Sequence, residues 1–299
     1  MDSFPSTPGT FTPLPKFGHV LQQGVMPLFT KANEQETPIG TGFMISADGL
    51  MMTAAHVVYA AIAAGQRRLS TDRKFYDHYE LYALYVTDKE HGTEGHRLGG
   101  FLPIQKVWLD EKLDIALCWV ERPILEDGPL PFTLCRLSPG LPKEGEHVTG
   151  FGYYQMSSQR QEKEVEGKTI IDYEHKTAVT PGEIVKVYPR YRDRGLLNFP
   201  CFETNARFDP GMSGGPIWNE RGFVCGVICA SSDSSHSYGS LLWLALGIVI
   251  EVASATGGPV EKITLYDLIQ RGFVATDETI KNITVKWGDN GNRDISVKR

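Results

Sequence analysis

The chain has 299 residues, enough for two packed units of ordinary size or for one large domain with extensions. Its 41% hydrophobic and 22% charged residues, with 31 glycines and 18 prolines, exclude a fibrous or largely disordered protein. The formal charge of −6 gives no overall positive field, and no basic stripe with interleaved aromatic residues is present. We therefore expect no nucleic-acid partner.

The N-terminal segment predicts an extended arm. It contains several prolines and lacks a positively charged start followed by an apolar run, so it does not resemble a secretory signal, and a cytoplasmic location is expected. The longest apolar run, at 241–250, is about half of the roughly twenty residues that a membrane helix needs. It predicts a buried strand, and no membrane partner is expected.

Short apolar or alternating runs separated by turn signals predict an all-β sandwich or barrel. Asp48-Gly49, between GTGFMIS and LMMTAAHVV, is typical of a β-hairpin turn, and 219–222 supplies a second one. The polar segments 66–100 and 155–180 are expected to be solvated loops or hairpins. Near the end, the apolar spacing of LYDLIQRGF predicts a short helix.

The same pattern suggests a division of the chain. The segment 121–142 is rich in proline and glycine and is the expected linker between an N-terminal and a C-terminal barrel. The expected parts are an N-terminal extension at 1–28, a first barrel at 29–135, a second barrel at 136–256, and a C-terminal helix and tail at 257–299.

The five cysteines predict free, mostly buried thiols. They are odd in number and lack the CxxC spacing of a zinc site, so we expect neither a full disulfide framework nor a metal. They are Cys118, Cys135, Cys201, Cys225 and Cys229.

The strongest chemical signal is Gly-Met-Ser-Gly-Gly-Pro at 211–216. A serine that acts as a nucleophile must be exposed on a tight turn, and flanking glycines allow unusual backbone angles and close approach of a substrate. The backbone N–H groups of Gly211 and Ser213 can converge where the oxyanion of a tetrahedral intermediate would form. The motif predicts Ser213 as the nucleophile and these two groups as the oxyanion hole.

A nucleophilic serine also needs a base and an acid. His56 closes Thr-Ala-Ala-His just after the first predicted hairpin, and Asp114 opens an apolar strand in Leu-Asp-Ile-Ala-Leu, where it could fix the imidazole tautomer. Taken singly, a histidine at a strand end and a turn carboxylate could both be structural. Their order with Ser213 favours a catalytic triad in the cleft between two barrels.

These motifs resemble the trypsin-like (chymotrypsin-fold) serine peptidase family, and most of all bacterial trypsin-like and HtrA-like protease domains, over roughly residues 38 to 232. The resemblance implies an all-β fold of two six-stranded antiparallel β-barrels, no cofactor, a protein or peptide substrate, and an acyl-enzyme mechanism. It also implies that the strand at Cys229, Ala230 and Ser231 pairs with the substrate backbone.

The chain departs from the family in its expected regulation. Met212 stands where secreted members carry an aspartate that pairs with a newly cut N-terminus, so regulation, including by a partner protein, is expected to come from elsewhere. The residues after 250 are too few for the PDZ domain that HtrA proteins append.

The resemblance also implies that the residue six positions before Ser213, here Arg207, lies at the base of the substrate pocket, so specificity is expected to depend on its orientation. If Arg207 points into the substrate pocket, it would favour an acidic side chain before the scissile bond. If it points outward, Phe208 would shape an apolar pocket. Because burying an unpaired arginine is costly, the sequence favours an apolar or small residue at this position of the substrate.

The leading functional hypothesis is an intracellular serine endopeptidase that acts on specific protein partners. A catalytically silent trypsin-like scaffold that binds a partner in its cleft is the first alternative, although the intact set of His56, Asp114, Ser213 and Gly211 argues against it. An esterase that uses the same triad is the second alternative.

Overall fold

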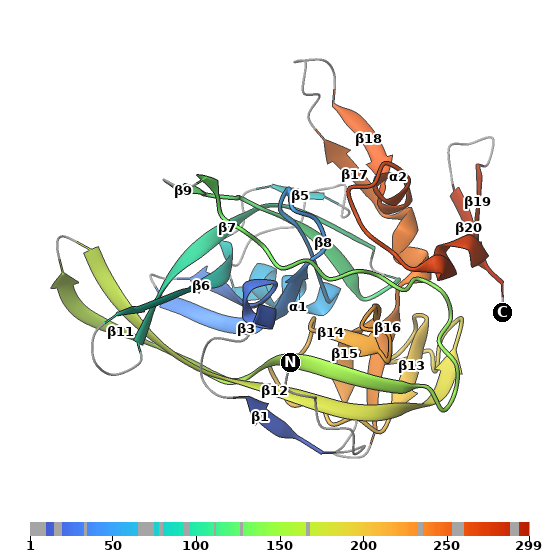
Figure 1. Cartoon of the computed structure of the whole chain (residues 1–299), viewed down its shortest axis with the longest axis horizontal. Coiled ribbons are helices and arrows are strands. Elements are labelled where there is room, and N and C mark those ends of the chain that lie inside the picture. The colour runs from blue at the N-terminus through green and yellow to red at the C-terminus, as the bar shows by residue number, and fades with distance from the viewer. Residues whose placement is uncertain are drawn as a thin grey trace.

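The computed structural model describes residues 10–14, 20–32, 35–64, 75–77, 80–91, 96–110, 112–125, 128–165, 168–231, 236–252, 260–287 and 293–298. Two closed antiparallel β-barrels make up most of the molecule, and a C-terminal segment of short helices and hairpins lies beside them (Figure 1). Six strands close each barrel, and one further strand extends each sheet. This architecture confirms the predicted fold.

The first barrel has the strand order β7-β6-β2-β3-β4-β8, and β8 pairs back to β7 while β5 is added outside β7. The predicted turn at Asp48-Gly49 joins β3 to β4, with Gly49 at a φ of 103°. The polar segment 66–100 contains most of the β6–β7 hairpin. The strands are β2 (Val25–Ala32), β3 (Gln35–Met44), β4 (Leu50–Thr53), β5 (Phe75–Asp77), β6 (Leu81–His91), β7 (His96–Asp110) and β8 (Ile115–Val120).

A helix follows β4 where the sequence analysis grouped 50–58 as one apolar run. The strand ends at Thr53, and α1 (Ala55–Ala64) begins two residues later. Half of the α1 residues are alanine, the strongest helix former, and Val57 and Val58 are buried in the first barrel's core. This helix carries His56 in its first turn.

The second barrel has the order β12-β11-β14-β15-β16-β13, and β13 pairs back to β12 while β1 is added outside β12. The predicted turn at 219–222 joins β14 to β15, with Gly222 at a φ of 76°. The strands are β1 (Thr12–Leu14), β11 (His147–Val165), β12 (Lys168–Tyr188), β13 (Cys201–Thr204), β14 (Pro216–Asn219), β15 (Val224–Ser231) and β16 (Ser237–Leu241).

The β11–β12 hairpin, expected as a loop or hairpin at 155–180, extends from the second barrel past the first (Figure 1). Its strand β11 contacts β2 and β3. The buried hydroxyl of Tyr153 donates a hydrogen bond of 2.8 Å to the Val25 carbonyl. The hairpin therefore joins the two barrels along one side.

The predicted strand at 241–250 is wrong. Strand β16 ends at Leu241, and the 3₁₀ helix η2 (Trp243–Gly247) separates it from β17 (Val249–Val252). Ala245 and Leu246 of η2 are buried, and a short apolar run does not distinguish a strand from a buried helical turn.

The remaining elements are short. The expected C-terminal helix is α2, and Thr264 and Asp267 form a capping box at its start. The other elements are η1 (Val20–Gln23), β9 (Ile124–Leu125), β10 (Gly128–Pro129), β18 (Glu261–Thr264), α2 (Leu265–Gln270), η3 (Glu278–Asn282), β19 (Ile283–Trp287) and β20 (Arg293–Val297).

The described strands refine the expected division of the chain. The first barrel begins with the buried Val25, inside the range 1–28 that was expected to be an extension, and β1 joins the second barrel's sheet. The expected boundary near 135 lies in the connector between β10 and β11. There, buried Leu137 hydrogen-bonds to the backbones of Ala275 and Asp277. The remaining limits stay predictions.

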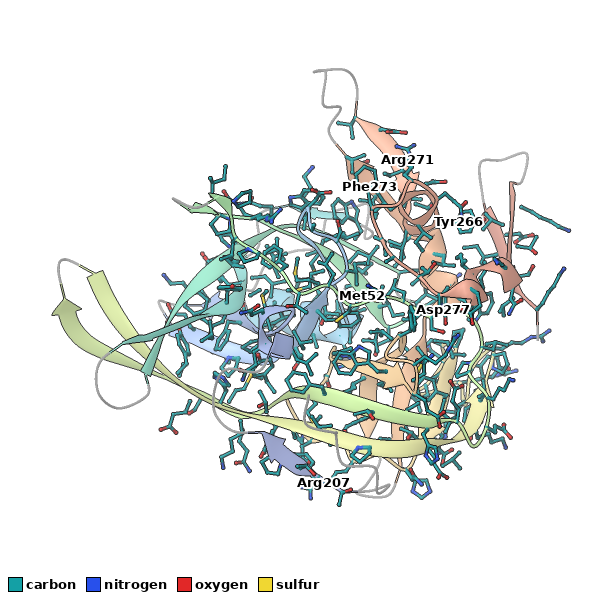
Figure 2. All side chains as sticks on the ribbon, viewed as in Figure 1. Met52, Arg207, Tyr266, Arg271, Phe273 and Asp277 are labelled. Carbon is teal, nitrogen blue, oxygen red and sulfur yellow. The ribbon has the colours of Figure 1, made fainter. Side chains whose placement is uncertain are left out.

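Asp277 fixes the C-terminal segment to the second barrel (Figure 2). Its buried carboxylate accepts the N–H of Thr279 at 3.0 Å, which caps η3, and also pairs with Arg221 in the β14–β15 turn. One side chain thus satisfies a helix end and holds it against the barrel.

Asp277→Ala is expected to lower the free energy of unfolding by about 1–2 kcal/mol, because it removes a helix cap and the partner of Arg221. Asp277→Asn keeps a capping oxygen and should cost less. Urea unfolding followed by tryptophan fluorescence measures both variants. Equal losses would show that the cap contributes nothing beyond the ion pair.

Candidate active site

His56 and Asp114 form a closely paired couple. Nδ1 of His56 lies 3.0 Å from each carboxylate oxygen of Asp114, and the His56 backbone N–H donates to Oδ1 at 3.0 Å. The Asp114 side chain is 12% exposed, whereas that of His56 is 44% exposed. A carboxylate at Nδ1 keeps a proton on that nitrogen, so Nε2 is left to accept one.

The backbone of Asp114 is in the left-handed region, with a φ of 48°. Aspartate tolerates this conformation better than most residues, but it still costs free energy and is often found at functional sites. The turn at Asp114 lies just before β8, so the carboxylate reaches His56 before regular pairing begins.

Ser213 lies in the loop between β13 and β14, and hydrogen bonds hold the backbone on both sides of it. The bonds run from Met212 N–H to Asp209 O (3.0 Å), from Gly214 N–H to Ile228 O (2.8 Å) and from Gly215 N–H to Met212 O (2.9 Å). In the part of the chain that the structure describes, the N–H groups of Gly211 and Ser213 donate no hydrogen bond. These are the two groups that the sequence predicts as oxyanion donors.

Thr41 on β3 reaches this loop from the first barrel. Its backbone N–H donates to the Ser213 carbonyl at 2.8 Å, and its hydroxyl donates to the Gly211 carbonyl at 2.9 Å. The same hydroxyl accepts the N–H of Tyr153 at 3.1 Å, and Thr41 is fully buried. Sequence reasoning missed this residue; its signal was the Gly-Thr-Gly at 40–42, which served only as the start of a strand.

Gly214 brings the Ser213 loop against the segment that carries His56. Its φ is 85°, and a Cβ there would lie 2.2 Å from Thr53 Oγ1 and 3.0 Å from Ala54 N. The loop and the turn into α1 are therefore in contact. No hydrogen bond links the side chains of Ser213 and His56 in the described structure, and such bonds are often long before substrate binds.

Arg207 has the outward orientation. Its side chain is 46% exposed and forms a bidentate pair with Asp209, with Nε–Oδ1 at 2.7 Å and Nη2–Oδ2 at 2.9 Å. Its Cζ also lies 4.6 Å from the ring centre of Phe11. Phe208 is 4% exposed and packs in the second barrel's core against Gly150.

Strand β15 runs past the end of β14 beside this loop. Its pairing with β14 ends at Val227, whereas its pairing with β16 continues to Ser231 through Ala230. The Cys229 side chain is buried, and its sulfur lies 3.1 Å from the Tyr238 carbonyl. Residues 229–231 therefore extend beyond β14 along the side of β15 that faces it, a geometry to which extended peptides can add.

All five cysteines are free and buried, as predicted. Burial raises the pKa of Cys118 and of Cys135 to about 12, so neither thiol ionises near neutral pH. Within the described ranges, no cluster of histidine, cysteine and carboxylate side chains is arranged to hold a metal ion. No described helix combines the length and apolar character needed to cross a membrane.

Comparisons with known proteins point to one family. A profile described as "Trypsin-like peptidase domain" matches residues 40–227. Serine proteases HTRA1 of Xenopus laevis and Xenopus tropicalis are each 26% identical over 215 residues, which are 71% of this chain and 35% of theirs. The chain thus spans about a third of the length of these curated relatives.

Solved structures are similar at lower identity. The active form of the Rv3671c protease from M. tuberculosis is 20% identical with a TM-score of 0.45, and the match covers 81% of this chain and 88% of that one. Deg5 is 19% identical with a TM-score of 0.45, and the match covers 72% and 83%.

Thr41→Val is expected to lower the free energy of unfolding by about 1–3 kcal/mol, because it leaves the Gly211 carbonyl and the buried Tyr153 N–H without their partner. Thr41→Ser keeps the hydroxyl and should lose much less. Urea unfolding compares the two variants. A valine variant as stable as the serine variant would mean that the hydroxyl does not hold the loop.

Proposed function

Because the chain belongs to the trypsin-like peptidase domain family, we propose that it is a serine endopeptidase with His56, Asp114 and Ser213 as its triad. The observation that carries the proposal is the 3.0 Å contact between His56 Nδ1 and the Asp114 carboxylate, on a segment that touches the loop of Ser213. Together these residues supply a base, an orienting acid and a nucleophile.

In the proposed acylation step, Ser213 Oγ bonds to the scissile carbonyl carbon while His56 Nε2 takes the hydroxyl proton. The N–H groups of Gly211 and Ser213 donate to the resulting oxyanion. His56 then gives the proton to the leaving nitrogen as the carbon–nitrogen bond breaks. Asp114 stays ionised and stabilises the imidazolium.

Water completes the proposed cycle. His56 takes a proton from water as its oxygen bonds to the acyl carbon, and it returns the proton to Ser213 Oγ when the ester bond breaks. The acid product leaves, and no cofactor enters the balance.

We also propose that a substrate peptide pairs with β15 at residues 229–231 and presents an apolar or small residue before the scissile bond. The outward pair of Arg207 with Asp209 supports this preference, because a guanidinium already paired at the surface offers no charge to an acidic substrate side chain.

An intracellular setting, with specific proteins as substrates and a partner protein as regulator, is part of the same proposal. Five free, buried cysteines fit a reducing compartment, where thiols stay unpaired. The acidic pI near 5.8 fits protein substrates better than nucleic acid.

A fluorophosphonate probe is expected to label the wild-type protein and the Ser138→Ala control but not Ser213→Ala, because only an activated serine reacts.

Asp114→Asn should lower kcat on the order of 10⁴-fold, since the imidazole loses its proper tautomer. Gel fluorescence and peptide turnover measure these effects. Folded wild-type protein that stays unlabelled would favour a binding scaffold, and turnover of esters without peptides would favour an esterase.

A peptide-library cleavage profile is expected to prefer apolar or small residues before the cut. Arg207→Ala should keep that preference, whatever its effect on rate, because its guanidinium is already paired with Asp209. An acidic preference that Arg207→Ala abolishes would instead place the guanidinium in the pocket.

A further inference from the structure

The loop that presents the oxyanion donors depends on contacts with its surroundings. No helix or strand lies between Thr204, which ends β13, and Pro216, which begins β14. Met212, directly before Ser213, is fully buried and carries no charge that could anchor the loop through an ion pair. Its backbone N–H donates to the Asp209 carbonyl, and its sulfur lies 3.3 Å from the Asp209 nitrogen.

Asp209 therefore connects the buried and exposed sides of the loop. Its backbone holds Met212 in the interior, and its carboxylate holds the guanidinium of Arg207 at the surface through two parallel hydrogen bonds. Such a bidentate pair fixes orientation as well as distance. Whatever holds Arg207 also holds the turn that leads to Gly211.

The N-terminal strand β1 and the residue before it hold Arg207 in place. Strand β1 pairs with β12 through Thr12, Pro13 and Leu14, and Figure 2 shows Arg207 beside β1. The ring of Phe11 stands edge-on to that of Tyr154, with centroids 4.8 Å apart at 85°. Because Arg207 lies 4.6 Å from the same ring, Phe11 contacts both side chains.

Tyr154 borders the oxyanion peptide on its other side. Gly211 has a φ of 99°, and a Cβ there would lie 2.8 Å from the Tyr153 carbonyl and 3.4 Å from the Tyr154 Cα. Desolvation, and then the charge of Asp209, raise the pKa of the Tyr154 hydroxyl, while Arg207 lowers it. The charges of Arg207 and Asp209 therefore both act on the Tyr154 hydroxyl.

We propose that Phe11 and Arg207 are positioning residues for the oxyanion hole. With β1 docked on β12, Phe11 holds Arg207 beside Tyr154, the Asp209 turn is fixed, and the Gly211 N–H faces the cleft. When β1 is released, the turn at Asp209 relaxes and the Gly211 N–H no longer points toward the substrate oxyanion. This inference rests on the proposed function for its effect on catalysis, but not for the coupling between arm and loop.

The contact of Phe11 with Arg207, which we call the clamp, is suited to reversible control. Within the described residues, strand β1 makes three residue pairs with β12, and the Arg207 side chain is about half exposed, so we expect release of β1 to cost less than unfolding a barrel. A partner that binds the released arm would shift the population toward the inactive loop.

Kinetics test the effect on catalysis. Phe11→Ala and Arg207→Gln should each lower kcat for a peptide substrate about tenfold, equivalent to about 1.4 kcal/mol, with KM changed less than twofold. A peptide aldehyde, whose adduct needs the oxyanion hole, should bind both variants about tenfold more weakly. Phe11→Tyr should keep the wild-type kcat, and Arg190→Gln, the same change at another exposed arginine, should match wild type.

The double variant separates a shared pathway from two independent ones. Because Phe11 and Arg207 act through one contact, Phe11→Ala with Arg207→Gln should lose little more than either single change, rather than a hundredfold. Additive losses would overturn the clamp, as would a changed KM with kcat preserved.

Hydrogen exchange tests the coupling without activity. In the Ser213→Ala background, Phe11→Ala should speed amide exchange in 205–214 about tenfold, and Arg190→Gln should leave it unchanged. Unaltered exchange would overturn the inference even if the enzyme is active. If the wild type resists the fluorophosphonate probe but exchange still depends on Phe11, the proposed function fails while the clamp is supported.

Discussion

The two barrels meet closely where Gly214 lies against β3 and β4, and the geometry of the site depends on this approach. A Cβ at Gly214 would lie only 2.1 Å from the Thr41 carbonyl oxygen and 2.2 Å from Thr53 Oγ1. Any other residue would push the barrels apart. Because His56 follows Thr53 by three positions and Ser213 precedes Gly214, such a shift would separate the proposed base from the proposed nucleophile.

The features that the sequence predicted well are local ones. The Asp48-Gly49 turn and the helix at LYDLIQRGF each draw on signals within a few positions. The long-range contacts were out of reach for the same reason. The Thr41 hydroxyl bonds to a carbonyl 170 positions away, and a threonine between two glycines gives no sign of such a partner. The strand prediction for 241–250 failed because an apolar stretch as short as η2 shows no periodicity that distinguishes a strand from a helix.

For Arg207, position in the sequence and energetic cost gave opposite expectations. Its distance from Ser213 suggested a pocket residue, whereas the cost of burying an unpaired guanidinium favoured the surface. The structure pairs Arg207 with Asp209, two positions later, which the sequence analysis did not use. Phe11, which covers the pair, could not be predicted as a partner, because only the antiparallel pairing of β1 with β12 brings the N-terminal arm to this face.

The oxyanion loop has little freedom left once its hydrogen bonds are formed. Because the N–H groups of Met212 and Gly214 and the carbonyls of Gly211 and Ser213 are hydrogen-bonded, the N–H groups of Gly211 and Ser213 can serve a developing negative charge without reorganisation during the reaction. Thr41 fixes the loop from the first barrel, and Phe11 with Arg207 fixes its other side from the N-terminal arm. On this reasoning, a competent site requires the oxyanion loop, β3 of the first barrel and the N-terminal strand β1 to be docked together.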